Sequence, residues 1–495
     1  MQSAVDQFNS VPPAGVAAPS QAMIERWRSI RADLDGLSAD VDRLGTQITG
    51  SPSASHPGPL EIFNGYIGVF VVAFLVTLAV TPLMRRLAIA NGVVDRPGEA
   101  RKLHKVPIAY LGGVGVYFGI VAGVLFSYLA PWHGMLQFHA VRPEHLGEVG
   151  IPLPVPYFVM IGMTIIMVIG LLDDVSNISP WQKVGGQLLA AALLAMDNVG
   201  VKIAYQVLYP IGKWMGYGPE MAATTKWVLF TLPPLPGVGA IEFDVVYWTG
   251  TAIIAIFVLG ACNASNLIDG LDGLLSGTTA IASTGLLIVA LGLAAVDAGP
   301  LDASRIVLCL ALLGGCLGFL PHNFNPAVIF LGDSGSLLLG FTTIVVVLTL
   351  GDQGRTDLVL AGLVIYALPI LDTVLAIIRR KLSGKRIADA DDQHLHHMFK
   401  QALGVKGAVL TLYGIGALFA VLGVLLTMSR ARITYTAVGV IALFICVMAI
   451  KVARRRALEE QLALAAKSSS APPVPAPPTA LREPAGPVTS SADKR

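Results

Sequence analysis

Charged residues, cysteines and a secretory leader are the features that this sequence has little of. Only 13% of its 495 residues are charged and the formal net charge is +2, so we expect no nucleic-acid partner. The four cysteines lie in or beside apolar runs without metal-ligand spacing, and we interpret them as small packing residues (Cys262, Cys309, Cys316 and Cys446). Residues 1–22 hold no apolar core of a signal peptide, so a cleaved leader is not expected.

Apolar residues are abundant instead. They make up 54% of the chain, the mean hydropathy is +0.68, and several runs reach the roughly 20 residues that cross a bilayer. The sequence therefore predicts an all-α, polytopic membrane bundle of about 10 or 11 transmembrane helices. The predicted spans are 62–84, 110–130, 157–172, 184–197, 246–262, 274–297, 304–321, 335–351, 357–378, 406–428 and 432–451. Residues 198–245 form an excursion rich in Pro, Gly and aromatic residues, in which a hairpin is one option.

The two ends of the chain differ from this membrane region in composition. Residues 1–59 contain apolar positions at alternating steps of four and three from Met23 to Ile48, which is a short heptad pattern, followed by a Pro- and Ser-rich linker. The heptad predicts either an amphipathic helix on the membrane or a self-association segment that makes a homodimer. Residues 456–495 end in a Pro-, Ala- and Ser-rich stretch that we expect to be disordered. The membrane domain is accordingly predicted to span 60–455.

A polar stretch between two apolar runs, NASNLIDGLDGL, is the strongest candidate for a site. Asn263, Asn266, Asp269 and Asp272 follow one another at three-residue spacing, interrupted by two glycines. A charged residue inside a membrane helix is costly and marks a site by default. The glycines indicate that the helix opens there and exposes backbone N–H groups, which suit phosphate. A helix-capping turn would use the same residue types.

Four further polar clusters follow other spans. LLDDVSNISPWQK places Asp173 and Asp174 side by side, with Lys183 nine residues after the second, and FLGDSG places Asp333 in a Gly-flanked turn. Histidines and lysines complete the set: HLHH contains His394, His396 and His397, and RKLHK contains Lys102 and His104. Each of these has an ordinary alternative, namely a helix end, a turn, a solvated loop or a membrane anchor. Adjacent aspartates on a helix point about 100° apart, so Asp173 and Asp174 cannot both address one atom equally, and we expect one of them to act indirectly, through Lys183 or a metal.

The order of the spans places all these clusters on one face, because each follows an odd-numbered span. The loops on that face carry most of the basic residues, including six in 85–109 and six in 379–405. The positive-inside rule therefore predicts that this face is cytoplasmic and that the amino terminus lies outside. Carboxylates and amides that suit Mg²⁺, beside cationic loops that suit phosphates, indicate phosphoryl chemistry on an anionic substrate.

The motifs RKLHKVPIAYLGG, LLDDVSN, NASNLIDGLDGL, FLGDSG and HLHHMF, in this order, resemble the polyprenyl-phosphate N-acetylhexosamine-1-phosphate transferases over about residues 60–455. This family, glycosyltransferase family 4 of integral membrane enzymes, includes the phospho-MurNAc-pentapeptide translocase and the undecaprenyl-phosphate GlcNAc-1-phosphate transferases. HLHH is more similar to the second branch. Ala109 stands where the family often has proline, which leaves the shape of that turn open.

The resemblance implies an enzyme of the inner (plasma) membrane, active on its cytoplasmic side, that transfers GlcNAc-1-phosphate from UDP-GlcNAc to undecaprenyl or another polyprenyl phosphate and releases UMP. It also implies Mg²⁺, with Mn²⁺ as a substitute. By matching positions, Asn266 and Asp333 hold the metal, and Asp173 and Asp174 act on the lipid phosphate as catalytic residues. The implied substrate-binding residues are Lys102, His104, Lys183, Asn263, Asp269, Asp272, His394, His396 and His397.

Two alternatives stay open at this point. Within the enzyme class, the phospho-MurNAc-pentapeptide translocase is the second candidate. In another class, a secondary transporter would also place acidic residues in its spans, but near the bilayer midplane and in both halves of an inverted repeat. The acidic clusters of this chain lie at span ends on one face, which favours the enzyme.

Overall fold

The computed structural model describes residues 58–95, 107–129, 154–214, 227–232, 241–296, 301–382 and 395–444, with isolated residues after them. The predicted heptad helix, the linker and the carboxy-terminal tail lie outside these residues. So do the predicted site residues Lys102, His104 and His394. The domain boundaries at 59 and 455 stay predictions.

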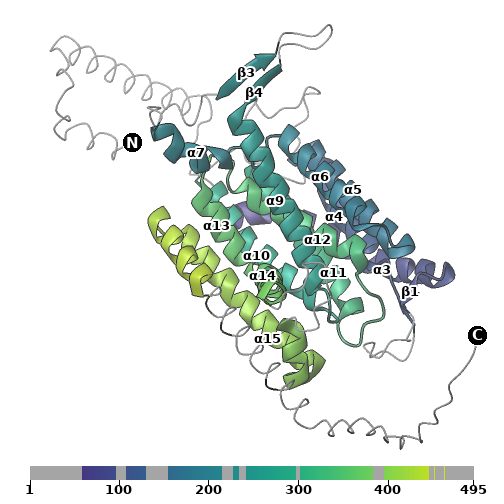
Figure 1. The fold of residues 1–495 in the computed structure, drawn as a ribbon. Coiled ribbons are helices and arrows are strands. Elements are labelled where there is room, and N and C mark those ends of the chain that lie inside the picture. The colour runs from purple at the N-terminus through teal and green to yellow at the C-terminus, as the bar shows by residue number, and fades with distance from the viewer. Residues whose placement is uncertain are drawn as a thin grey trace, which may run out of the picture.

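The described chain is almost entirely helical, which confirms the predicted fold class. The helices are α3 Pro59–Ala90, α4 Gly112–Leu129, α5 Tyr157–Ser176, α6 Pro180–Met196, α7 Ile203–Trp214, α9 Val245–Ile268, α10 Leu274–Ala294, α11 Asp302–Asn323, α12 Gly332–Thr349, α13 Thr356–Ile365, α14 Ala367–Leu382 and α15 Leu395–Thr427. A last apolar helix follows at Ala431–Phe444. Four strands form two antiparallel pairs, β1 Val94–Asp95 with β2 Ile108–Ala109 and β3 Val228–Leu232 with β4 Ile241–Asp244 (Figure 1).

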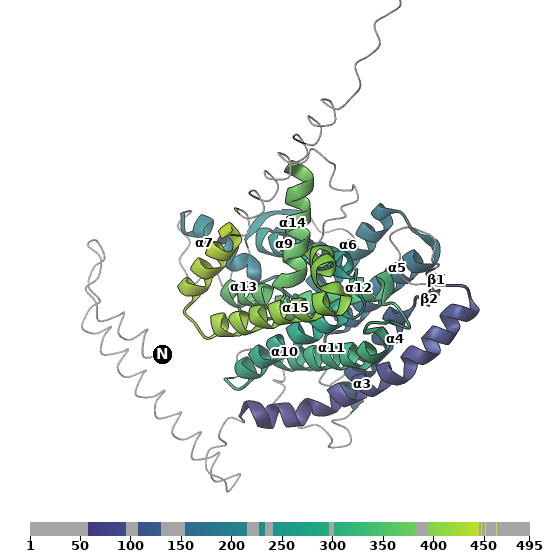
Figure 2. The ribbon, with the colours of Figure 1, turned by 90° about the horizontal axis from the view of Figure 1, so that it is seen from below.

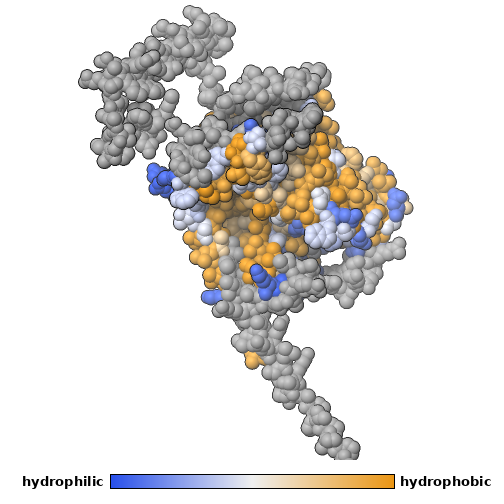
Figure 3. Space-filling model, turned by 45° about the horizontal axis from the view of Figure 1, so that its top comes forward, coloured by the Kyte–Doolittle hydropathy of each residue, from blue (hydrophilic) through white to orange (hydrophobic). Residues whose placement is uncertain are grey.

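Each of the eleven predicted spans corresponds to helix in the structure. Eight described helices are long and apolar enough to cross a membrane, and a ninth span is the pair α13–α14, which is bent by 82°. The other two, α6 with 17 residues and the helix at Ala431–Phe444, are shorter. Apolar side chains cover the sides of the bundle (Figure 3), among them Leu75, Ile256 and Leu418, each more than half exposed. The chain is therefore a multi-pass membrane protein.

Helix α12 is the centre of the bundle. In its apolar window 89% of residues are buried, against 22% in the peripheral helix α3 (Figure 2). Two of its buried threonine hydroxyls bond within the helix: Thr342 donates to the Leu338 carbonyl at 2.8 Å and Thr343 to the Leu339 carbonyl at 2.7 Å. The central position matters for the site because the GDSG turn is the first turn of this helix.

The bend between α13 and α14 has a local cause and a tertiary one. Pro369 lacks the N–H that would bond to the carbonyl of Ile365, which weakens a continuous helix here and suits the first turn of α14. Tyr366, buried at the break, shares a hydrogen bond with the Ser265 hydroxyl of α9. As a result α14 leaves the bundle at a steep angle, which Figure 2 shows.

The described parts of the excursion, 198–214, 227–232 and 241–245, lie at the opposite end of the bundle from the β1–β2 pair (Figure 1). The excursion contains the β3–β4 pair, so the hairpin expected as one option is present. It also contains the helix α7, which was not predicted. The rings of Phe230, Phe243 and Trp248 stack along this hairpin at centroid distances of 5.1 and 5.7 Å.

Candidate active site

The GDSG turn begins α12 and is held by Asp174 of α5. The Asp174 carboxylate accepts the backbone N–H of Asp333 at 2.7 Å and that of Ser334 at 3.0 Å, which are open donors at the start of a helix. Gly332 has a positive φ of 73°, and a Cβ there would stand 2.6 Å from the Asp174 carboxylate. Only glycine therefore allows this close approach.

A short extended segment before α4 supports the same turn. The Ala109 carbonyl accepts the N–H of Phe330 at 2.8 Å, and the N–H of Gly113 donates to the Leu331 carbonyl at 2.8 Å. Ala109 is buried and pairs with Val94 in the β1–β2 ladder. The turn at Ala109, whose shape the sequence left open, is therefore the end of a strand. It lies alongside the residues that lead into the GDSG turn.

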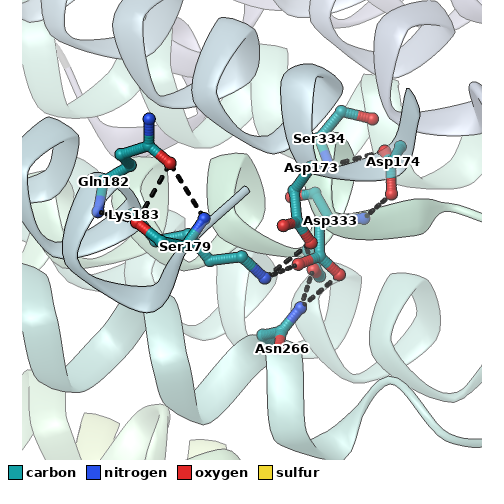
Figure 4. Close-up of polar contacts among 9 residues, drawn as sticks. Asp173, Asp174, Ser179, Gln182, Lys183, Asn266, Asp333 and Ser334 are labelled. Atoms are coloured by element: carbon teal, nitrogen blue, oxygen red, sulfur yellow. Dashed lines mark hydrogen bonds and ion pairs between the residues drawn. The ribbon is translucent and has the colours of Figure 1, made fainter. Parts of the chain in front are cut away.

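Lys183 joins two carboxylates from different helices. Its ammonium lies 2.6 Å from Asp173 and 2.6 Å from Asp333, while Asn266 of α9 donates to the other oxygen of Asp333 at 2.8 Å (Figure 4). These ionic side chains are only 14–27% exposed, so water screens them weakly. Asp173 and Asp174 address different groups, as the angle between them predicts, and the partner of Asp174 is the backbone of α12.

The position of Lys183 follows from a helix start in the sequence. Ser179 accepts the backbone N–H of Gln182, and the Gln182 side chain accepts the N–H of Ser179 at 2.9 Å, which is a capping box. Pro180 occupies the first turn of α6, where its missing N–H costs nothing. Lys183 therefore lies in the first turn of a helix whose start is fixed by a capping box.

The DGLDG segment is an open turn between α9 and α10, as the glycines predict. α9 ends at Ile268, and Gly273 has a φ of 77°. Asp272 accepts the side-chain amide of Asn325 at 2.8 Å and the backbone N–H of Ala327 at 3.1 Å. The Asn323 side chain accepts the N–H of Gly273 at 3.0 Å. The loop at 323–327 thus holds one side of the turn.

Asp269 is the strongly perturbed carboxyl of this turn. Burial raises its pKa to about 8, and the negative charges of Asp333, Asp174 and Asp272 act in the same direction. The raised pKa favours the protonated carboxyl, and a cation beside it would favour the charged form. The charge of Asp269 is therefore sensitive to the groups that lie beside it in the turn.

The histidines occupy two different environments. His396 is 2% exposed, with its Nδ1 3.3 Å from the Asp372 carboxylate of α14. His397 is partly exposed, and its ring centroid lies 4.4 Å from that of His396. Asp372 was not among the predicted site residues. Its sequence signal was available, because a single aspartate inside an apolar run is costly in a membrane helix.

A cavity of about 540 Å³ lies between these elements. Its lining includes the predicted residues Asn266, Asp269, Asp272 and Asp333. It also includes polar and aromatic residues that the sequence analysis did not single out: Asp95, Tyr110, Asn323, Asn325, Phe330 and Lys400. Some of these stand in HNFNP, a polar segment between two apolar runs, which is a signal that could have been used.

Asn263 does not face this cavity. Its side-chain amide donates to the Gln187 side chain of α6 at 3.0 Å and to the Leu259 carbonyl at 2.7 Å. One helical turn separates it from Asn266, which does reach Asp333. Asn263 therefore joins α9 to α6, and substrate contact by its side chain stays a prediction.

Comparison with known proteins identifies the family. Residues 157–351 match the sequence profile of Glycosyl transferase family 4. The chain is 32% identical over 360 residues to the decaprenyl-phosphate N-acetylglucosaminephosphotransferase of Mycolicibacterium smegmatis, covering 70% of this chain and 78% of that protein. This chain belongs to glycosyl transferase family 4.

Two further members show the breadth of the family. One, from Bacillus subtilis, is named as a probable undecaprenyl-phosphate N-acetylglucosaminyl 1-phosphate transferase and is 29% identical over 77% of this chain and 90% of its own length. The other is the phospho-N-acetylmuramoyl-pentapeptide-transferase of Bacillus cytotoxicus, 30% identical over 71% of this chain and 95% of its own length. The resemblance seen in the motifs is confirmed, and the chain is a transferase, so the transporter alternative is wrong.

Proposed function

We propose that this protein transfers N-acetylglucosamine-1-phosphate from UDP-N-acetylglucosamine to a polyprenyl phosphate, undecaprenyl phosphate in the first instance, and releases UMP. One observation carries the proposal: Asp173, Lys183, Asn266 and Asp333 converge at one end of the membrane helices, and the last two line an open cavity. A site at the end of the spans suits an acceptor whose tail lies in the bilayer and a donor that is water-soluble. The names of the relatives support the choice of substrates.

The charge of the cluster supports a divalent cation. The cluster holds three carboxylates, Asp173, Asp174 and Asp333, and one ammonium group, Lys183, which contacts the first and the third. An excess of negative charge therefore faces a substrate that is itself anionic. Within the described part of the chain, no three His, Cys, Asp or Glu side chains stand where one ion could be held. The donors available are nevertheless the oxygens that Mg²⁺ prefers.

We assign Asp333 and Asn266 as the residues that would hold Mg²⁺, with Mn²⁺ as a substitute. Asn266 presents its amide nitrogen to Asp333 in this arrangement, and a half-turn of the amide would present its oxygen instead. When bound, the ion would supply positive charge to the diphosphate and to the leaving UMP. The protein's own contribution is Lys183, which already touches both carboxylates.

The lipid phosphate is an oxygen nucleophile that is already anionic, so a direct displacement suffices. Its oxygen attacks the phosphorus that carries the sugar, a new P–O–P bond forms, and the bond to UMP breaks. One phosphoanhydride replaces another, which makes the reaction nearly thermoneutral. We assign Asp173 to orienting the lipid phosphate or accepting its proton, because Asp174 is engaged with the start of α12.

We place the donor nucleotide at the DGLDG turn. Asp269, Asp272 and Asn325 line the cavity there, and Lys400 of α15 adds a cation. The predicted phosphate contacts of His394, His397, Lys102 and His104 stay predictions. The cytoplasmic, plasma-membrane location of this face also rests on the positive-inside rule, to which the basic end of α14 contributes (Arg379, Arg380 and Lys381).

The deciding experiment uses the purified full chain, radiolabelled polyprenyl phosphate and a panel of UDP-sugars with Mg²⁺. We expect a lipid diphosphate-sugar and equimolar UMP with UDP-N-acetylglucosamine, and loss of both products with EDTA. Product with UDP-MurNAc-pentapeptide alone would instead assign the phospho-MurNAc-pentapeptide reaction. No product with any UDP-sugar would contradict the proposal.

A second measurement separates direct attack from a double displacement. The enzyme is incubated with UDP-N-acetylglucosamine and labelled UMP in the absence of lipid acceptor. Direct attack predicts no label in the UDP-sugar under these conditions, because no sugar-phosphoryl enzyme forms. Rapid exchange would require such an intermediate.

A further inference from the structure

Asp372 and His396 are two ionisable residues buried where the described chain offers them almost no water. Their side chains are 1% and 2% exposed, and they approach each other from α14 and α15 at 3.3 Å. Burying such groups is unfavourable unless each has a polar partner. A pair of this kind fixes the orientation of the imidazole ring, because the ring nitrogen nearer the carboxylate is committed to it.

The opposite edge of the His396 ring lies against the DGLDG turn. A Cβ at Gly270 would stand 2.4 Å from Nε2 and 3.1 Å from the two neighbouring ring carbons. Gly270 itself lines the cavity, whereas His396 does not. The ring therefore stands behind the turn, between it and Asp372, and not in the space where a substrate would bind.

The helices that position Asp372 and His396 also contact the elements on both sides of the DGLDG turn. Asp372 lies about two helical turns after the α13–α14 break, where Tyr366 is bonded to Ser265 of α9. α9 leads directly into the turn, and the Tyr413 hydroxyl of α15 donates to the Gly273 carbonyl at its far end at 2.5 Å. Residues 269–273 are thus held by contacts from α9, α14 and α15.

We propose that Asp372 and His396 are positioning residues that hold the DGLDG turn in the shape that binds the donor nucleotide. This inference rests on the proposed function and changes one expectation from the resemblance, which implied that His396 itself binds the substrate. In this assignment, the effect of Asp372 on the turn passes through His396, and the effect of His396 passes through Gly270 and its neighbours. Both residues therefore affect the UDP-sugar and not the lipid acceptor.

The test compares Asp372→Asn, His396→Asn and the double variant in the purified full chain. Each single variant is expected to raise the KM for UDP-N-acetylglucosamine and the dissociation constant of UMP about tenfold, the effect of one buried charge-assisted hydrogen bond. The KM for polyprenyl phosphate and kcat should stay within about twofold of wild type. The double variant should match the single ones, because the two residues act in series.

Two more variants keep the result interpretable. Asp372→Glu retains the carboxylate and should recover most of the UMP affinity. Val374→Ala, at a residue of α14 that is 36% exposed, is the matched control and should behave as wild type. If Asp372→Asn does not fold, His396→Asn and Asp372→Glu still decide the question through UMP affinity.

Several outcomes would overturn the inference: a double variant about a hundredfold weaker than wild type, equal effects on both substrates, or a fall in kcat with unchanged UMP affinity. The last would make His396 a catalytic residue. The proposed function is judged separately by wild-type transfer. If the wild type binds UMP but transfers nothing, the function is wrong, while the UMP affinities of the variants still test the positioning of the turn.

Discussion

Removing the charge of Asp174 should lower stability, whereas removing the charge of the adjacent Asp173 should lower activity alone. Asp174 accepts two backbone N–H groups of α12, whereas Asp173 contacts Lys183. In Asp174→Asn the amide keeps one acceptor oxygen, and its NH₂ group then faces a backbone N–H. In Asp173→Asn only one partly exposed ion pair changes, and Lys183 keeps Asp333 as its second partner.

The structure sets the size of each effect. Losing one charge-assisted hydrogen bond at Asp174 costs about 1.5–3 kcal/mol, and losing the charge at a helix start adds roughly 0.3–1 kcal/mol. We therefore expect Asp174→Asn to lower the free energy of unfolding by about 2–4 kcal/mol. The ion pair of Asp173 contributes about 0–1 kcal/mol to stability. Its loss should instead reduce kcat on the order of 100-fold, as expected for a group that acts on the nucleophile.

The assay heats each variant in detergent, measures the folded fraction that remains by size-exclusion chromatography, and measures UMP release on unheated protein. Asp174→Asn should lower the midpoint temperature on the order of 5 °C and also reduce activity, because Asp333 moves with the turn. Asp173→Asn should keep the wild-type midpoint while losing activity. Equal midpoints for the two variants would refute the assignment of Asp174 to the start of α12.

Three further predictions concern the metal, the orientation in the membrane and the pH dependence of stability. Asp333→Asn should lower turnover on the order of 10²–10³-fold at saturating Mg²⁺ while the protein still inserts; near-normal turnover would remove Asp333 from the metal site. Cysteines introduced at the exposed residues Ser176 and Leu403 should react with an impermeant thiol reagent only from the cytoplasm, and one at Trp214 only from outside; any reversal would contradict the proposed orientation. The folded pKa of Asp269 is raised from 3.8 to about 8, so the folded state binds its proton more tightly. Stability of the ligand-free protein should therefore fall as pH rises from about 4 to 8, and this slope should be smaller in Asp269→Asn; an identical slope would show that Asp269 does not titrate in this way.

The sequence alone determined the class of protein and the local chemistry. Eleven apolar segments predicted the helices, because burying apolar side chains in lipid depends mainly on composition and length. The glycines of DGLDG predicted an open turn, and Ser179, Pro180 and Gln182 are a recognisable helix start, since both features depend on backbone preferences of a few adjacent residues. The order of the motifs was also sufficient to recognise the family.

Which side chains meet was decided by the tertiary structure. Lys183 and Asp333 are 150 residues apart, and only the packing of α5, α6 and α12 brings them to 2.6 Å. The same packing gives Asp174 a backbone partner, turns Asn263 toward Gln187 and places Asp372 behind the DGLDG turn through His396. Spacing within one helix specifies the direction of a side chain, but the partner it finds there depends on how the other helices cross it.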